Sequence, residues 1–150
     1  MNLTSAGWSI LRAEAVLAAL SMVMWVWMMA TRLPAMKRAG LDPQAAARTA
    51  DLHAKLPPSV MRISDNYNHL FEAPTVFYAV ATMLAITGAA DSSAVVAAWS
   101  YVGLRIGHSL VQASGRPVVL RFALFSLSQI ALLVLTVLAA WVLFAGGTPS

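Results

Sequence analysis

The chain contains no cysteine. This absence excludes a disulfide, a thiol nucleophile and a thiolate metal site. Charged residues are also scarce, since Asp, Glu, Lys and Arg make up 11% of the 150 residues, whereas a typical soluble domain contains about 25%. Hydrophobic residues account for 59% of the chain, and its mean hydropathy is +0.71. This composition is typical of an integral membrane protein.

Long apolar stretches predict four membrane-spanning helices. Three stretches carry no charged residue: 15–31, 73–90 and 122–147. Each is long enough to cross a hydrocarbon core of about 30 Å at about 1.5 Å per residue. A fourth stretch crosses only by carrying Arg105 and His108. We therefore predict an all-α integral membrane protein, with helices at about 7–31, 63–88, 92–114 and 118–145.

The connections between these helices predict their arrangement. The turns at 87–93 and 113–117 are short, so consecutive helices should be antiparallel neighbours in an up-down four-helix bundle. The one long polar connector, about 32–61, includes a segment at 41–56 with helix-forming composition, which Asp42 and Pro43 would begin. No repeat or linker is visible, so residues 1–150 are expected to form a single four-span domain.

The distribution of basic residues predicts the orientation in the membrane. The sequence pI of about 10.1 could indicate nucleic-acid binding, but membrane topology explains the positive charge better, and no nucleic-acid partner is expected. Arg116 and Arg121 flank the last turn, and only Arg12 lies near the opposite side. Six more basic residues lie in the connector: Arg32, Lys37, Arg38, Arg48, Lys55 and Arg62. The positive-inside rule then places the 32–61 loop in the cytoplasm and both termini in the periplasm of a bacterial inner-membrane protein. No cleaved signal peptide is expected, because no basic segment precedes the first apolar run.

Polar side chains fall at one depth within the predicted helices. A charge at the centre of a membrane helix costs roughly 2.5–3.5 kcal/mol, so Glu72 and Arg105 need a partner or a purpose. Counted at ~1.5 Å per residue from the turn at 87–93, which is expected on the outer side, Glu72 lies ~24 Å deep, His108 ~22 Å and Arg105 ~18 Å. Arg121 and His108 both lie ~8–10 Å from the turn at 113–117, which is expected on the cytoplasmic side. We expect a pocket or an ion-pair network in this layer, nearer the cytoplasm.

Two stripes of polar residues belong to this layer. Asp65, Asn68 or His69, and Glu72 share one side of the second helix, and Arg105, His108 and Gln112 follow at i, i+3 and i+7 on the third. His69 could be a stripe member or a surface residue, and the two interpretations are equally supported. His53, in the connector, is expected to be solvated.

The layer has two other interpretations. In the first, the layer is purely structural, with Glu72 paired to Arg105 and with Asn68, His108 and Gln112 completing the hydrogen bonds. In the second, His69, Glu72 and His108 hold a metal ion. Arg105 and Arg121 disfavour a cation and suit an anion instead, so no metal is expected.

The sequence resembles the membrane-associated proteins in eicosanoid and glutathione metabolism, the MAPEG family. The segment NHLFEAPTVFYA is similar to the Asn- and Glu-containing second helix of bacterial members, which is kinked by proline. The segment YVGLRIGHSLVQ resembles the family's R-x-x-H motif, here Arg105 and His108. Arg121 follows thirteen residues after His108, as the fourth-helix arginine of glutathione-using members does.

The resemblance implies a homotrimer that binds glutathione between subunits and transfers it to, or uses it to reduce, a lipophilic substrate from the bilayer. Arg121 would be catalytic by stabilising the glutathione thiolate. The glutathione-binding positions implied are Arg32, Lys37, Asn68, Glu72, Arg105, His108, Gln112 and Arg121. Phe122 and Phe125 stand where the prostaglandin E synthase branch has a serine and a tyrosine, and Gln112 replaces a tyrosine. The alternative is a non-catalytic membrane scaffold or accessory subunit whose polar cluster is structural.

Overall fold

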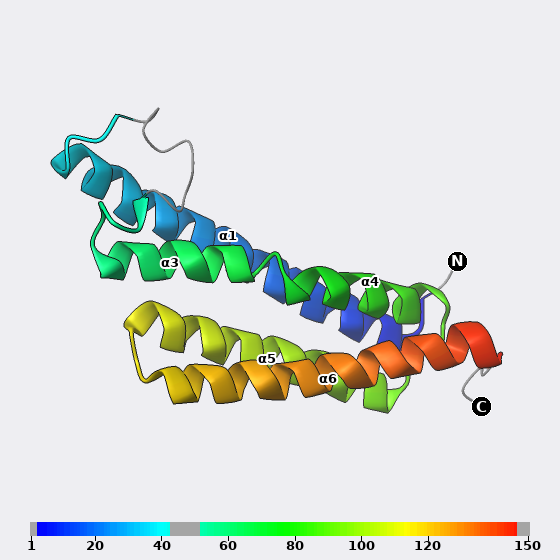
Figure 1. The fold of residues 1–150 in the computed structure, drawn as a ribbon. Coiled ribbons are helices and arrows are strands. Elements are labelled where there is room, and N and C mark those ends of the chain that lie inside the picture. The colour runs from blue at the N-terminus through cyan, green and yellow to red at the C-terminus, as the bar shows by residue number, and fades with distance from the viewer. Residues whose placement is uncertain (1–2, 43–51, 147–150) are drawn as a thin grey trace.

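The computed structural model describes residues 3–42 and 52–146. Figure 1 shows long helices running side by side. The helices are α1 (Ser5–Arg38), α3 (Pro58–His69), α4 (Ala73–Ile86), α5 (Ser92–Ser114) and α6 (Val118–Ala145). Because α3 and α4 together form one apolar span, the described part of the chain contains four candidate membrane spans. The predicted all-α, four-span architecture is confirmed.

The helices form an up-down bundle. The beginning of α1 and the end of α6 lie at one end of the bundle, and the α5–α6 turn and the start of α3 lie at the other (Figure 1). Helix α1 packs against α3, α4 and α5, while α6 packs mainly against α5 and also against α4. Large side chains from several helices fill the interface, among them Leu17, Phe77, Leu84, Tyr101 and Leu135, all at most 1% exposed. Helices α3 and α6 are not packed closely together within the described residues, and this leaves room between them at the end where the two basic loops lie.

Helix α1 is longer than the sequence predicted. The expected end at residue 31 was wrong, because the helix continues through Pro34 to Arg38. Its 34 residues make a rod of about 51 Å at 1.5 Å per residue. A small apolar cluster holds the extension in place, formed by Met36 with Leu52, Leu56 and Met61. Most of the helix predicted at 41–56 lies outside the described residues, so that prediction remains open.

The second span is broken where the sequence predicted one continuous helix. Helix α3 ends at His69 and α4 begins at Ala73, with Glu72 at φ −91° and ψ −102° between them. Pro74 explains the break, since a proline lacks an N–H and its ring clashes with the carbonyl four residues earlier, here that of Leu70. Pro74 is instead accommodated in the first turn of α4, where no intrahelical donor is needed. The break therefore frees backbone carbonyls at the end of α3 inside the bundle.

Both ends of α5 are capped. The Asp91 carboxylate accepts a hydrogen bond from the backbone N–H of Ala94 at 2.8 Å, and this bond, with a second from the Ser93 hydroxyl, lowers the pKa of Asp91. At the other end Gly115 adopts φ 70°, a left-handed conformation that glycine accepts without steric cost. A Cβ at Gly115 would lie 3.0 Å from the Arg62 guanidinium, so the N-terminal part of α3 packs directly on this cap.

Candidate functional site

A pocket opens at the break in the second span. It has a volume of about 220 Å³ and lies between the α3–α4 break, α5 and the first turns of α6. His69 and Glu72 line it from the break, His108 from α5 and Arg121 from α6. Its apolar wall belongs to α6 and consists of Val118, Phe122 and Phe125. Three of the residues that the sequence placed at one depth, Glu72, His108 and Arg121, therefore line the same pocket.

The side chains of Glu72 and His69 are in hydrogen-bond contact across the break. The Glu72 carboxylate oxygen Oε2 lies 2.8 Å from His69 Nδ1. The two side chains are 62% and 42% exposed, respectively, so the pair sits at the mouth of the pocket. The ion pair expected between Glu72 and Arg105 is absent from the described residues, because the carboxylate engages the nearer imidazole instead.

Arg105 acts on the backbone of the break. Its side chain is completely buried, and its Nη2 donates a hydrogen bond to the His69 carbonyl oxygen at 2.7 Å. That carbonyl is one of those freed at the end of α3, where the helix dipole also favours a positive charge. Arg105 thus caps the C-terminal end of α3 and fixes the backbone position of His69. The guanidinium also lies 6.0 Å from the centre of the Phe125 ring.

The rings of His69, His108 and Phe125 lie near one another along the pocket, in edge-to-face and tilted arrangements. The ring centres of His69 and His108 are 6.4 Å apart, with the rings nearly perpendicular at 84°. His108 also lies 6.0 Å from the ring of Phe125. His108 Nδ1 is buried and has no hydrogen-bond partner among the described residues. Arg121 forms no ion pair with a described side chain, so its positive charge is available to an anion in the pocket.

The remaining candidates lie outside this pocket. Gln112 is buried in α5, with its Oε1 lacking a partner among the described groups. Asn68 is exposed on α3, and Lys37 is exposed near the end of α1, whereas Arg32 is partly buried there. None of the four is among the residues that line the pocket of the single chain.

The asparagine that joins the helices is Asn66 rather than Asn68. Asn66 is fully buried, and its Nδ2 donates to the Ser109 carbonyl oxygen of α5 at 3.1 Å. The sequence held a signal for this, because Asn66 lies three residues after Ile63 and four before Leu70, both of which are buried. This spacing places Asn66 on the apolar face of the helix.

Asp65 does not join the polar stripe predicted with Glu72. Its carboxylate oxygen lies 3.2 Å from Nε2 of His53, which belongs to the end of the connector. The side chains are 36% and 48% exposed, so His53 is partly solvated, as expected, and also contacts α3. The pair lies at the end of the bundle that carries the basic loops, away from the pocket at the break.

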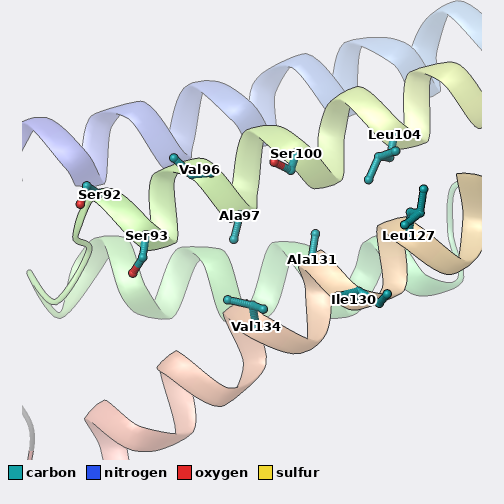
Figure 2. Close-up of a pocket in the computed structure, with 10 residues that line it drawn as sticks. All are labelled: Ser92, Ser93, Val96, Ala97, Ser100, Leu104, Leu127, Ile130, Ala131 and Val134. Atoms are coloured by element: carbon teal, nitrogen blue, oxygen red, sulfur yellow. The ribbon is translucent and has the colours of Figure 1, made fainter.

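A larger cavity lies elsewhere on the bundle and contains no ionisable side chain. It measures about 560 Å³ and runs along α5 and α6 towards the start of α5. Figure 2 shows its lining, with Ser92 and Ser93 near the start of α5 and Val96, Ala97, Leu104 and other apolar side chains beyond them. These groups offer no acid, base or nucleophile beyond neutral hydroxyls. Of these two cavities, only the smaller one is lined by ionisable side chains.

The metal interpretation receives no support from the geometry. Within residues 3–42 and 52–146, no group of three or more histidine, aspartate or glutamate side chains is arranged to hold a metal ion. His69 and Glu72 already engage each other, and Arg121 lines the same pocket. This arrangement is suited to an acidic or thiol-bearing molecule.

The fold and the pocket define a polytopic α-helical membrane protein with a polar site inside its bundle. The model of the MAPEG family matches residues 10–141. The chain therefore belongs to the MAPEG family, and the four spans have the MAPEG arrangement. Neither a curated protein nor a solved structure matched the chain.

Proposed function

We propose that this MAPEG protein is a glutathione- or related-thiol-dependent transferase or peroxidase that acts on a lipophilic substrate. The observation that carries the proposal is the convergence of Glu72, His108 and Arg121 on one pocket. These residues come from three separate spans, and the break that exposes Glu72 lies inside the membrane-spanning bundle. Irregular backbone at such depth is tolerated in membrane proteins where it is buried or lines a cavity.

The chemistry of the lining fits a thiol tripeptide. The Arg121 guanidinium can bind a carboxylate or stabilise the thiolate as the sulfur attacks. Glu72 engages His69 with one oxygen and keeps the other for the amino group of the ligand. His108 lines the pocket as well, and its imidazole can donate to or accept from the ligand. Phe122 and Phe125 add an apolar wall against which a lipophile from the bilayer can lie.

The role of Arg105 and the small volume of the pocket both refine the proposed site. Arg105 is a positioning residue, because it holds the His69 carbonyl and touches no open part of the pocket. The volume of about 220 Å³ is smaller than the roughly 300–1,000 Å³ of pockets that hold whole small molecules. We therefore propose that a neighbouring subunit completes the site, in the homotrimer that the family resemblance implies. Arg32 and Lys37 would reach the ligand only across such an interface.

The second candidate is a scaffold whose polar groups only join the helices. Two contacts favour it: the Arg105 bond to the His69 carbonyl and the Asn66 bond to the Ser109 carbonyl. Both link α3 to α5 without needing a ligand. Membrane topology alone does not require that Arg121 line a pocket with Glu72 and His108, however, and the enzyme proposal uses this position.

The test compares Arg121→Ala with Arg116→Ala, measured in detergent. Arg116 is exposed in the α5–α6 turn and does not line the pocket, so it is the matched control. We expect millimolar glutathione to raise the melting temperature of the wild type and of Arg116→Ala by mass action. Arg121→Ala should lose this shift and lose turnover by about 10²–10³-fold, the usual cost of one electrostatic stabiliser, while its melting temperature without glutathione stays unchanged.

The scaffold predicts a different result. Glutathione would leave the melting temperature of the wild type unchanged, and no thiol-dependent turnover of an electrophile or a lipid hydroperoxide would be detected. A loss of assembly or of basal stability in Arg121→Ala would likewise contradict the enzyme proposal.

A further inference from the structure

Among the polar residues that line the pocket, His69 is the one that the proposed function leaves without a role. In a solvated surface pair the imidazole would need no particular orientation. Here the backbone of His69 is fixed by the Arg105 hydrogen bond at 2.7 Å, and its ring is fixed by the Glu72 carboxylate at 2.8 Å from Nδ1. Both ends of the residue are thus held, which is unusual for a side chain that is 42% exposed.

The contact with Glu72 also determines which ring nitrogen is free. A carboxylate accepts a hydrogen bond, so the nitrogen beside it carries the proton and the neutral imidazole has its lone pair on Nε2. No described residue is bonded to Nε2 of His69. The ring lines the same pocket as Arg121, so an acceptor for a proton and a stabiliser for a negative charge border one cavity.

Other groups that could accept a proton in this pocket are few. Phe122 and Phe125 carry no hydroxyl, and the guanidinium of Arg121 is always protonated and cannot act as a base. His108 faces Phe125 and His69 with its ring and has no carboxylate partner among the described residues. Among the lining side chains, the imidazole of His69 is the one that a carboxylate orients.

We propose that His69, oriented by Glu72 and held by Arg105, is the catalytic base that takes the proton from the thiol. This inference rests on the proposed function and assigns a proton acceptor to the same site. The S–H proton of the thiol moves to Nε2 of His69, and the thiolate forms beside Arg121. The sulfur electron pair then forms the S–C bond with an electrophilic carbon of the lipophile.

The proton balance closes without a further reactant when the lipophile is an activated alkene. Addition of the sulfur moves the double-bond electrons onto the carbonyl oxygen, and the resulting enolate carbon takes the proton back from Nε2. His69 returns to its neutral form. The net reaction is addition of the thiol across the double bond, with no oxidation or reduction.

The titratable and charged groups near His69 define what a pH profile would report. Glu72 lies beside it at the break, Arg105 and His108 belong to α5, and Arg121 belongs to α6. Helices α1 and α4 contribute no lining residue within the described chain. The two arginines stay charged throughout, so a pH-dependent rate would report on the two histidines, on Glu72 and on the thiol itself.

The experiment compares His69→Gln with His53→Gln in the full-length protein in detergent, with glutathione and the conjugated aldehyde nonenal as probes. His53 pairs with Asp65 outside the pocket and serves as the matched control. Glutathione binding is measured by the thermal shift, the reaction by loss of nonenal, and both are followed against pH. We expect His69→Gln to bind glutathione within about threefold of the wild type and to lose turnover by about 10²–10⁴-fold, the range for a general base.

The pH profile separates a base from a structural residue. Without a base, the rate should rise only as the free thiol ionises, near pH ~8.5, so His69→Gln should recover activity in alkaline buffer. A structural defect would lower the rate by the same factor at every pH. If His69→Gln fails to fold, His69→Asn provides the second variant, and it should show the same loss of turnover at neutral pH and the same recovery in alkaline buffer.

The outcomes distinguish the two proposals. If the wild type shows neither a glutathione shift nor turnover, the proposed function is overturned and this inference with it. If the wild type is active and His69→Gln retains the wild-type rate and pH profile, the assignment of His69 as the base is overturned while the proposed function stands. A rate lowered by the same factor across all pH values would also overturn the base.

Discussion

Replacing Arg105 with methionine tests whether the buried guanidinium stabilises the bundle or positions the site. The hydrogen bond from Nη2 to the His69 carbonyl is worth about 1.5–3 kcal/mol as a bond to a charged donor. Arg105 Nε and Nη1 are also buried but have no partner among the described residues. Each such unsatisfied group costs about 1–3 kcal/mol, so together they cost about 2–6 kcal/mol.

The two terms predict the sign of the stability change. Methionine keeps a long flexible side chain in the core and carries no donor that needs a partner. The lost hydrogen bond is therefore offset by removal of the unsatisfied donors. We expect the free energy of unfolding of Arg105→Met to lie no more than about 1 kcal/mol below that of the wild type, or above it. Activity should fall, because the carbonyl of His69 is no longer held.

The assay is unfolding in mixed micelles titrated with a denaturing detergent, followed by circular dichroism and paired with the thiol-addition rate. Arg105→Lys is the comparison, since it keeps the charge but loses the planar guanidinium. A loss of several kcal/mol in Arg105→Met would refute the reasoning and favour a purely structural polar layer. An unchanged rate with unchanged stability would refute the positioning role.

Two further predictions concern the ends of α5. Gly115→Ala should lower the free energy of unfolding by about 1–2 kcal/mol, because φ 70° is costly for a residue with a Cβ and the new atom would meet Arg62. Gly103→Ala, where a Cβ meets nothing within 4 Å, should be neutral or stabilising by about 0.5–1 kcal/mol, and equal losses in both variants would contradict this account. Asp91→Ala should cost about 0.5–2 kcal/mol through loss of the N-cap bond to Ala94. The folded-state pKa of Asp91 is lowered from 3.8. The stabilisation that the Asp91 carboxylate provides is therefore present above pH 3.8 and is lost as pH falls through the folded-state pKa. Melting temperatures of Asp91→Ala should depend less on pH in this acidic range than those of the wild type.

The architecture could be predicted because it follows from hydropathy and loop length. Apolar stretches of sufficient length must cross the bilayer as helices, and the short turns leave antiparallel neighbours as the simple arrangement. Depth counting along straight rods was accurate enough to place Glu72, His108 and Arg121 in one layer, and they line one pocket. The family resemblance covered the same elements and is confirmed over residues 10–141.

The local contacts of the site could not be predicted from spacing alone. The prediction of one continuous helix at about 63–88 missed the full break at Pro74. Such a break depends on whether neighbours satisfy the freed carbonyls. Arg105 does so, and this draws it away from the carboxylate of Glu72. Helical periodicity then fails across residues 70–72, so the spacing could not give the direction of the Glu72 side chain. Its carboxylate contacts His69, while Asp65 contacts His53.

The apolar cluster of Met36, Leu52, Leu56 and Met61 is separate from the main core of the bundle. A group of four side chains excludes far less water than the long seam between the membrane spans, so its share of the total stability is small. We therefore expect the end of α1 to open locally at a lower free energy than the membrane spans do. Local opening of the end of α1 would then leave the packing of the membrane spans unchanged.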